Sequence, residues 1–313
     1  MRLFRPILLK AGIVALGTLA VAVFAADDPA EPPPAMITSS AAPTSPSSSL
    51  WNLPEFIERL PDFLSERLPD YESTGALRLY IRPHFGDFVH RDYVRVPVGV
   101  REKVSENIEV STELESYFTS GLKEAAGYGF DRLQLGAKCE HILPNFDNDG
   151  LSVGINYQTP LSRPPMDLTD GHRHFRPYVA ATNPLVPSWK ILGYATITGD
   201  FLQRTALPEN WGRNELHEDS LTFSAGVAKE WPRFHGSITA SVTTSELVSN
   251  EHQQVYALRP EIVVPWKSRP SSKSQILFTL GARAIHGPDG NEFGASGSVR
   301  IEFNLKRGAP STP

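Results

Sequence analysis

Charged residues at alternate positions are the side chains of this sequence whose types and spacing could do chemistry together. They carry both signs and lie in segments where every second residue is apolar. In a shared lumen, a ring of acids favours cations and a ring of bases favours anions. Interleaved signs can instead form ion pairs that brace a wall, and both interpretations stay open. The candidate pore-lining residues are Arg78, Arg82, Arg95, Glu109, Glu113, Lys138, Glu140, Arg259, Glu261, Arg283, Arg300 and Glu302.

Two short motifs resemble parts of metal sites. Residues 145–150, Asn-Phe-Asp-Asn-Asp-Gly, match the first half of a calcium loop, but the twelfth position is Asn156, where a bidentate Glu is needed. We favour a hairpin turn built from Asn, Asp and Gly. Residues 171–174, Gly-His-Arg-His, place two imidazoles one residue apart beside Asp167 and Asp170, with no assured third ligand. We therefore expect no metal and no cofactor.

Neither catalysis nor disulfide chemistry is indicated by a motif. The sequence lacks the Gly-x-Ser-x-Gly turn, and no other nucleophile is positioned by its neighbours. The single cysteine, Cys139, cannot form an internal disulfide, and we interpret it as a small apolar residue on a strand face. An enzyme is therefore not expected, although a lipid hydrolase with a site at the rim of a barrel stays open as an alternative.

The elements that must position the charged residues are recognised by a period of two that begins near residue 75. Leu77, Leu79 and Ile81, for example, alternate with Arg78 and Tyr80. Such alternation gives a strand one apolar and one polar face. A spacing of about 19 residues leaves room for about ten residues in a bilayer and a turn. The twelve predicted strands are 75–86, 92–102, 106–119, 130–142, 150–161, 173–183, 189–203, 218–230, 234–246, 253–266, 274–286 and 293–306.

The connections between these strands differ in length from one end to the other. The longest predicted connections, 119–129, 162–173 and 204–219, fall at one end. Tight ones, such as 101–105 and 230–233, fall at the opposite end. Long outer loops and short periplasmic turns are typical of outer-membrane barrels. With a periplasmic N-terminus the long loops point outward. Tryptophans at predicted strand ends would suit an interfacial girdle; they are Trp189, Trp231 and Trp266.

The N-terminal region predicts export. Arg2, Arg5 and Lys10 precede an apolar run over 11–24, and we expect a signal peptide over residues 1–25, with an uncleaved anchor as the alternative. Its removal changes the formal net charge from −5 to −8, because it takes three positive charges and no negative ones. An acidic chain of mixed signs gives no footprint for nucleic acid. Residues 26–50, rich in Pro, Ala and Ser, predict a disordered linker.

A short irregular repeat follows the linker. Leu-Pro-Glu-Phe, Leu-Pro-Asp-Phe and Leu-Pro-Asp-Tyr begin at residues 53, 60 and 68. Proline followed by an acid suits the first turn of a helix. We therefore predict a short amphipathic helical segment over residues 51–74. It could plug a pore mouth, lie against the inner leaflet or serve as a spacer. The barrel is expected over 75–306 and a C-terminal tail over 307–313.

The face that meets lipid decides between two architectures. After the signal there is no apolar stretch of about 18 residues, so a membrane protein would have to span as a closed barrel. With the apolar face inward, the same pattern would make a soluble secreted β-barrel. Apolar positions of middling size, polar positions of both signs and more strands than the roughly eight of a small ligand-binding barrel favour lipid on the outside.

At this point the chain resembles the bacterial outer-membrane β-barrel superfamily. The resemblance covers residues 75–306 and includes a closing strand with Val299, Ile301, Phe303 and Leu305 on one face. The superfamily commonly ends on an aromatic residue, whereas Lys306 and seven further residues follow here. The resemblance implies an antiparallel transmembrane β-barrel in the outer membrane of a Gram-negative-type bacterium, with membrane lipid and the barrel-assembly machinery as partners.

The function implied by this resemblance is a passive, porin-like channel for small polar solutes. The alternative from another class is a non-conducting structural or adhesive barrel that binds partners through its outer loops.

Overall fold

The computed structural model describes a barrel and a short helical segment that precedes it. The described residues are 53–69, 75–85, 93–119, 128–142, 150–161, 170–207, 209, 211, 214–249, 252–266 and 274–306. The expected signal peptide (1–25), linker (26–50) and tail (307–313) lie outside them, as does all but Gly150 of the turn 145–150.

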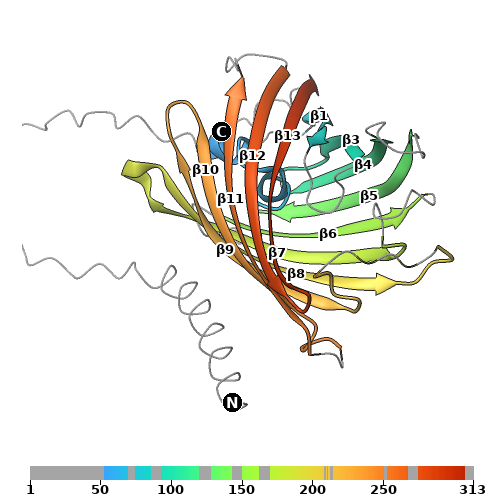
Figure 1. The fold of residues 1–313 in the computed structure, drawn as a ribbon. Helices are drawn as coiled ribbons and strands as arrows, with labels where there is room; N and C mark the ends of the chain where they lie inside the picture. The colour runs from blue at the N-terminus through green and yellow to red at the C-terminus, as the bar shows by residue number, and fades with distance from the viewer. Residues whose placement is uncertain are drawn as a thin grey trace, which may run out of the picture. The chain divides into compact units, whose positions relative to one another are not determined.

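The described strands form one closed antiparallel sheet (Figure 1). Neighbours along the chain are neighbours in the sheet from β2 to β13, and closure comes from the pairing of β1 with β13 and β3. The strands are β1 (Leu77–Ile81), β2 (His84–Phe85), β3 (Tyr93–Lys103), β4 (Ile108–Thr119), β5 (Tyr128–Glu140), β6 (Leu151–Pro160), β7 (Arg173–Val186), β8 (Ile191–Gln203), β9 (Ser220–Glu230), β10 (His235–Thr244), β11 (Gln254–Trp266), β12 (Ser274–Gly287) and β13 (Gly290–Lys306).

β1 and β2 are two halves of one barrel strand. Both pair with β3 and with β13, and residues 82–83 separate them. Pro83 has no N–H to donate to the ladder, which is why the single strand predicted over 75–86 is divided here. Hydrogen bonds from Arg82 N to Pro97 O (2.9 Å) and from Val299 N to Pro83 O (3.0 Å) bridge the interruption. The barrel therefore has twelve strands, which confirms the predicted number and closure.

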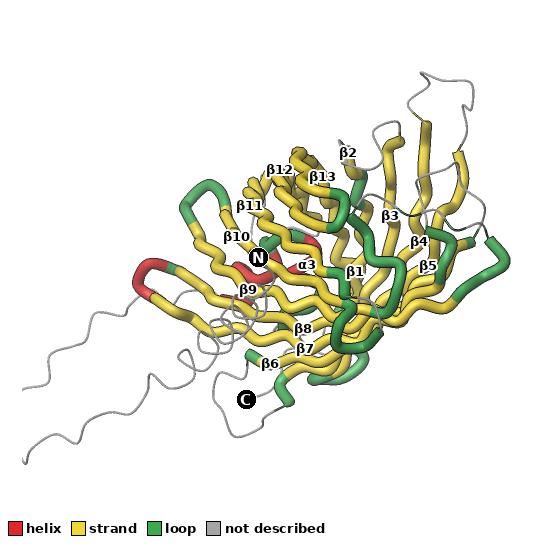
Figure 2. The backbone as a smooth tube through the Cα atoms, turned by 60° about the horizontal axis from the view of Figure 1, so that its bottom comes forward, coloured by secondary structure: helices red, strands yellow, loops and turns green. Residues whose placement is uncertain are grey.

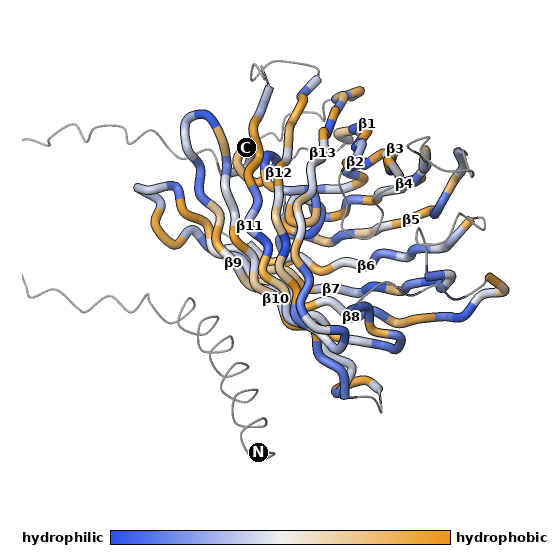
Figure 3. Tube along the Cα trace, in the orientation of Figure 1, coloured by the Kyte–Doolittle hydropathy of each residue, from blue (hydrophilic) through white to orange (hydrophobic). Residues whose placement is uncertain are grey.

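The apolar faces of the strands point outward. Ile238 and Leu280 are 53% and 64% exposed, whereas Glu140 and Arg300 on inward positions are at most 1% exposed. Figure 3 shows hydrophobic and hydrophilic residues alternating along the strands. An apolar exterior on a closed barrel, in which backbone groups pair within the sheet, is the surface of a transmembrane β-barrel. The alternative of a soluble barrel with a dry apolar centre is wrong.

The two ends of the barrel differ as predicted. One end, named here the long-loop end, carries the connections 120–127, 161–172 and 204–219. The other, the short-turn end, carries the tight connections 104–107, 187–190 and 231–234, together with the longer connections 141–150 and 267–273. One connection at the long-loop end is shorter than expected, because β13 begins at Gly290 and only residues 288–289 separate it from β12. Gly290 has a φ of 91°, a conformation that favours glycine in this tight hairpin.

Three tryptophans lie together at the short-turn end in the sheet register. Trp189 belongs to the β7–β8 turn, Trp231 follows β9, and Trp266 ends β11. The Lys229 ammonium lies 5.7 Å from the Trp189 ring and 5.2 Å from the Trp231 ring. Aromatic rings with a neighbouring lysine suit the interface between acyl chains and water.

Within the part of the chain that the structure describes, two short α-helices precede the barrel, α2 (Leu53–Glu58) and α3 (Asp62–Ser65). Figure 2 shows them in red, enclosed by the strands.

None of the helices among the described residues has the length and hydropathy needed to cross a bilayer.

Candidate functional site

Residues 53–69, named here the plug, lie inside the lumen. Pro61 precedes α3, and its carbonyl accepts hydrogen bonds from Leu64 N and Ser65 N. The plug side chains that are at most 1% exposed are all apolar: Phe56, Ile57, Leu60, Leu64 and Leu68. An amphipathic segment with no bilayer or protein core of its own can bury such residues only against the barrel wall.

One side of the lumen supplies that apolar wall. The Phe56 ring lies 5.5 Å from the His235 ring at the start of β10, and His235 pairs with Val263 on β11. At the same end of the neighbouring strands, inward positions are apolar and at most 1% exposed: Leu192, Ala228, Val263 and Leu277. The apolar face of the plug and this apolar wall therefore shield each other from water.

The opposite side of the lumen holds the acids of the plug. Glu58, Asp62 and Glu66 recur every four residues, and each meets an arginine from β1, β3 or β13 or from the link after β1. Glu66 also pairs with Arg82. The ion pairs with measured lengths are Glu58–Arg78 (3.0 Å), Asp62–Arg300 (2.8 Å), Asp62–Arg82 (3.6 Å) and Glu66–Arg101 (3.1 Å).

Backbone carbonyls of the plug are held as well. Lys138 Nζ donates to Leu68 O (3.1 Å), and Ser152 Oγ donates to Arg67 O (2.5 Å). Arg300 Nη2 donates to Glu58 O (2.5 Å) while its Nη1 reaches Ser65 Oγ (2.8 Å). Carbonyls near helix ends lack intrahelical donors, and here two cations and one hydroxyl of the wall supply the missing hydrogen bonds.

The electrostatic environment keeps Asp62 and Glu66, two of the plug acids, ionised. Burial raises the pKa of Asp62, but Arg300 and Arg82 outweigh burial and hold the pKa below its usual value of 3.8. Burial likewise raises the pKa of Glu66, and Arg82 and Arg101 outweigh it, so this pKa lies below its usual 4.5. Charged, hydrogen-bonded carboxylates thus tie the plug to the wall at neutral pH.

Some of the candidate pore-lining arginines and glutamates pair with each other across the wall. Arg82 pairs with Glu113, which also accepts a hydrogen bond from Tyr80 Oη at 3.0 Å. Arg78 instead meets Glu58 of the plug. Glu109 lies 3.6 Å from Lys138, which lies 2.5 Å from Glu140, and Glu140 also pairs with Lys103.

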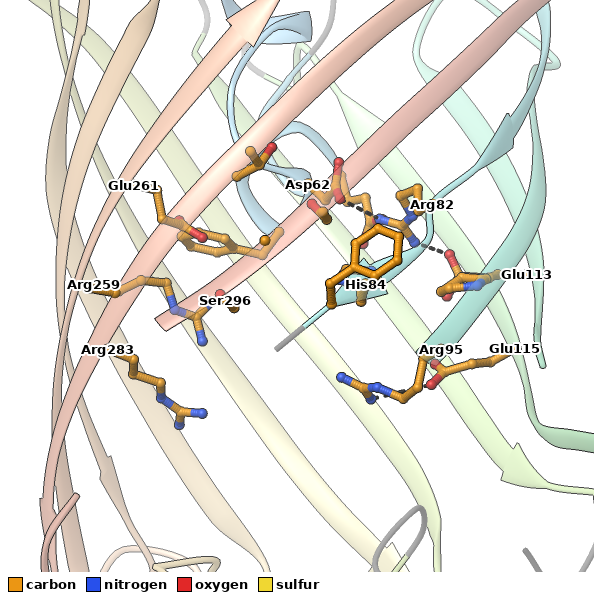
Figure 4. A pocket seen from close by; sticks show the side chains of 18 of the residues that line it. Asp62, Arg82, His84, Arg95, Glu113, Glu115, Arg259, Glu261, Arg283 and Ser296 are labelled. Atoms are coloured by element: carbon orange, nitrogen blue, oxygen red, sulfur yellow. Dashed lines mark hydrogen bonds and ion pairs between the residues drawn. The ribbon is translucent and has the colours of Figure 1, made fainter. Parts of the chain in front are cut away.

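A cavity of about 530 Å³ adjoins the plug. Figure 4 shows its side chains converging from several strands and from α3. Glu115 bridges Arg95 (3.2 Å) and Arg132 (2.7 Å) on one wall. Among described residues, its arginines are Arg82, Arg95, Arg132, Arg176, Arg259 and Arg283. Its acids in the same part of the chain are Asp62, Glu66, Glu113, Glu115 and Glu261.

The twelve candidate pore-lining residues fall into two groups. The cavity group is Arg82, Arg95, Glu113, Arg259, Glu261 and Arg283. The group nearer the short-turn end, buried beside the plug or in the β3–β5 wall, is Arg78, Glu109, Lys138, Glu140, Arg300 and Glu302. Glu302 lies 3.6 Å from Arg300.

Several residues of this network were not selected from the sequence. Arg101 and Lys103 continue the alternation that begins at Arg95, and Glu115 continues the one that contains Glu113. Arg132 follows a register shift in the β4–β5 pairing, which disturbs the period. The four-residue spacing of the plug acids is visible in the sequence, but it does not show which residues form ion pairs with them.

Four tyrosines lie flat on the lumen wall over glycines. Each tyrosine is buried, and each faces a glycine directly across two paired strands. A Cβ built on any of these glycines would collide with the ring or hydroxyl of its tyrosine. The pairs are Tyr80–Gly99, Tyr117–Gly129, Tyr178–Gly154 and Tyr194–Gly226. Glycine therefore lets large polar-tipped rings lie against the wall without filling the lumen.

The two histidines of residues 171–174 belong to the rim at the long-loop end. His174 Nε2 lies 2.8 Å from Asp170, and its Nδ1 lies 2.8 Å from Asp200. The His172 ring packs 4.8 Å from the Trp211 ring. Burial raises the pKa of Asp170, but the hydrogen bonds and charge interactions with His174 and His172 together outweigh burial and lower this pKa. These contacts tie the strand end to its neighbouring loop.

Comparisons with known proteins give similar chains among solved structures. No protein-family model matches the sequence, and no curated protein matches it either. Among solved structures, the KdgM porin is 8% identical and aligns over 73% of this chain and 99% of its own, with a TM-score of 0.43. The NanC porin is 12% identical over 72% of this chain and 100% of its own, with a TM-score of 0.45.

An outer membrane channel from Pseudomonas putida F1 is 11% identical to this chain. It aligns over 75% of this chain and 97% of its own, with a TM-score of 0.47. The chain is thus similar to two porins and an outer membrane channel over nearly the whole length of each.

Proposed function

We propose that this chain is an outer-membrane channel for small polar solutes whose lumen is closed at the short-turn end by its own plug. The membrane-facing exterior and the charged interior support a transport role. The observation that carries the proposal is the polar cavity of about 530 Å³, which adjoins a plug fixed by ion pairs and hydrogen bonds. Such contacts can break without unfolding the barrel, so the plug serves as a gate.

Single-channel recording in planar bilayers tests this role. The full chain without its signal should show long closed periods and brief openings. The triple variant E58Q/D62N/E66Q removes the acids that meet Arg78, Arg300 and Arg101 and keeps the side chains nearly isosteric. We expect its closed periods to shorten at least about ten-fold, since about 1.4 kcal/mol corresponds to a factor of ten.

The matched control is E106Q, which removes an exposed acid in the β3–β4 turn at the same end of the barrel. It should behave like the parent protein. A parent and a triple variant that both stay silent would overturn the channel. Equal, steady conductance in both would leave the channel and overturn the gate.

A second candidate function is a barrel that binds a partner through its outer loops. It is favoured by the ordered contacts of loop 204–219, in which Thr205 Oγ1 donates to Gly171 O (2.5 Å) and Asn214 N donates to Asp289 Oδ2 (2.9 Å). A shaped rim is what a loop-mediated binder needs. Shortening this loop should then abolish partner binding and leave conductance unchanged.

We propose no catalytic role. His174 is held by two carboxylates, and its partners are Asp170, Asp200 and Arg176 rather than a serine. Assay of the purified protein on phospholipid and on lipopolysaccharide should give no hydrolysis. Membrane lipid and the barrel-assembly machinery are the further partners that we propose.

A further inference from the structure

The wall formed by β11 and β12 carries two arginines at directly opposed positions. Leu258 pairs with Ala284 and Glu261 with Gly281, so Arg259 falls opposite Arg283 in the ladder. Figure 4 shows both side chains reaching into the cavity, across from Arg95. Like charges opposed on neighbouring strands destabilise a sheet. A negative group bound between them would relieve that repulsion.

Four of the five acids described in the cavity form ion pairs with cations other than Arg259 and Arg283. Glu115 bridges Arg95 and Arg132, and Glu113 pairs with Arg82. Asp62 and Glu66, the plug acids that line the cavity, also form ion pairs with Arg300 and Arg101, respectively. These two arginines do not line the cavity. Glu261 is the remaining acid of the described lining, two residues from Arg259 on the same strand. Among the described residues of the cavity, the β11–β12 wall therefore carries two arginines and one glutamate.

An aromatic ring of the plug packs against one of these arginines. Arg259 Cζ lies 4.9 Å from the centroid of the Phe63 ring on α3. A guanidinium that stacks on an aromatic face keeps its N–H groups, which lie in the guanidinium plane, available for an oxyanion. Ser296 on β13 lines the same cavity and adds a hydroxyl donor (Figure 4).

We propose that Arg259 and Arg283 form a binding site in the lumen for a small solute that carries oxyanion groups, either carboxylates or phosphates. Two forked guanidinium groups suit bidentate contacts to such groups. The cavity volume of about 530 Å³ suits a small molecule. This inference rests on the proposed channel, because it names the class of solute that the channel would take.

Titration calorimetry on the full, signal-free chain in detergent tests the site with three probes: citrate, inorganic phosphate and neutral glucose. Citrate or phosphate should bind saturably and glucose should not. R259Q and R283Q should each weaken binding at least about ten-fold, because a hydrogen bond to a charged group contributes about 1.5–3 kcal/mol. R259K should recover part of the loss, since it restores the charge without the fork.

R204Q is the matched control, because the Arg204 side chain is 85% exposed and lies outside the cavity. Heat-modifiable gel mobility should show that each variant keeps its folded barrel. Tighter citrate binding assigns the site to carboxylates, and tighter phosphate binding assigns it to phosphate esters. Absence of saturable binding by both anions, or binding that R259Q and R283Q leave unchanged, would overturn the site.

Conductance separates the two proposals. Citrate added to an open channel should shorten its openings, and this block should weaken in R283Q. A barrel that never conducts but loses citrate binding in R259Q would refute the channel and retain the site. A barrel that conducts, without citrate block or binding, would retain the channel and refute the site.

Discussion

At the residue scale, the proposed gate depends on the carboxylates of the plug. Asp62 and Glu66 are surrounded by Arg300, Arg82 and Arg101, and their pKa values are lowered although burial alone would raise them. A carboxyl group with a lowered pKa in the docked state contributes stability that is present above its undocked pKa. That contribution is lost as the pH falls through the lower docked value.

The first prediction is a channel that stays closed in mild acid. Docking should persist through pH 5 and should weaken only below the usual values of 3.8 and 4.5, where Asp62 and Glu66 take up protons. Open probability recorded from pH 7 to pH 3 measures this effect. In D62N the same rise should be smaller, because one titrating group is gone. Opening that is complete by pH 6 and unaltered in D62N would contradict this origin.

At the scale of the element, tyrosines lying over glycines set the distance between side chains on the lumen wall. Tyr80 faces Gly99 across β1 and β3, and its hydroxyl donates to Glu113 on β4. The Arg82 and Arg101 guanidinium carbons lie 4.7 and 5.1 Å from the ring centroid. One ring therefore joins three strands through packing, a hydrogen bond and two cation–π contacts.

The second prediction concerns this packing. Gly99→Ala forces the Tyr80 ring off the wall and should lower the free energy of unfolding by about 1–3 kcal/mol, the usual cost of overpacking. Gly297→Ala is the control, because its Cβ would meet Leu280 Cδ2 at 3.6 Å, an ordinary contact. Urea unfolding in lipid vesicles compares the two. In the background Y80A, the effect of Gly99→Ala should vanish, and persistence there would point to another cause.

The strands could be predicted from the sequence because alternation is a local property. The last strand alternates apolar residues with polar ones, and Arg300 and Glu302 are buried toward the lumen as that pattern requires. The division at Pro83 also has a local cause, but it was not anticipated because apolar residues continue the period across it. The plug contacts could not be predicted, since Arg300 and Asp62 are 238 residues apart and meet only once the sheet closes.

At the scale of the whole molecule, the outer face of the sheet is apolar and meets lipid, whereas the inner face is charged and lines the lumen. Residues on the lipid face tolerate charge according to their depth in the bilayer. Ile238 lies within β10, whereas Leu247 belongs to the turn that follows this strand at the long-loop end, and they are 53% and 61% exposed. Their surroundings should therefore differ although their exposure is similar.

The third prediction uses this difference. Ile238→Arg should lower the free energy of unfolding in lipid vesicles by about 2–4 kcal/mol, while Leu247→Arg should cost about 0–1 kcal/mol. Urea titration with heat-modifiable mobility as the readout measures both. Equal costs for the two substitutions would mean that β10 does not contact acyl chains. Parent protein that washes out of outer membranes with carbonate would be inconsistent with the same picture.

Glu58 of the plug contacts two different strands of the barrel. Its carboxylate meets Arg78 on β1, and its carbonyl accepts a hydrogen bond from Arg300 on β13. These are the first and the last strands, and their pairing closes the barrel. Because one residue contacts both of these strands, docking of the plug and closure of the barrel are physically linked.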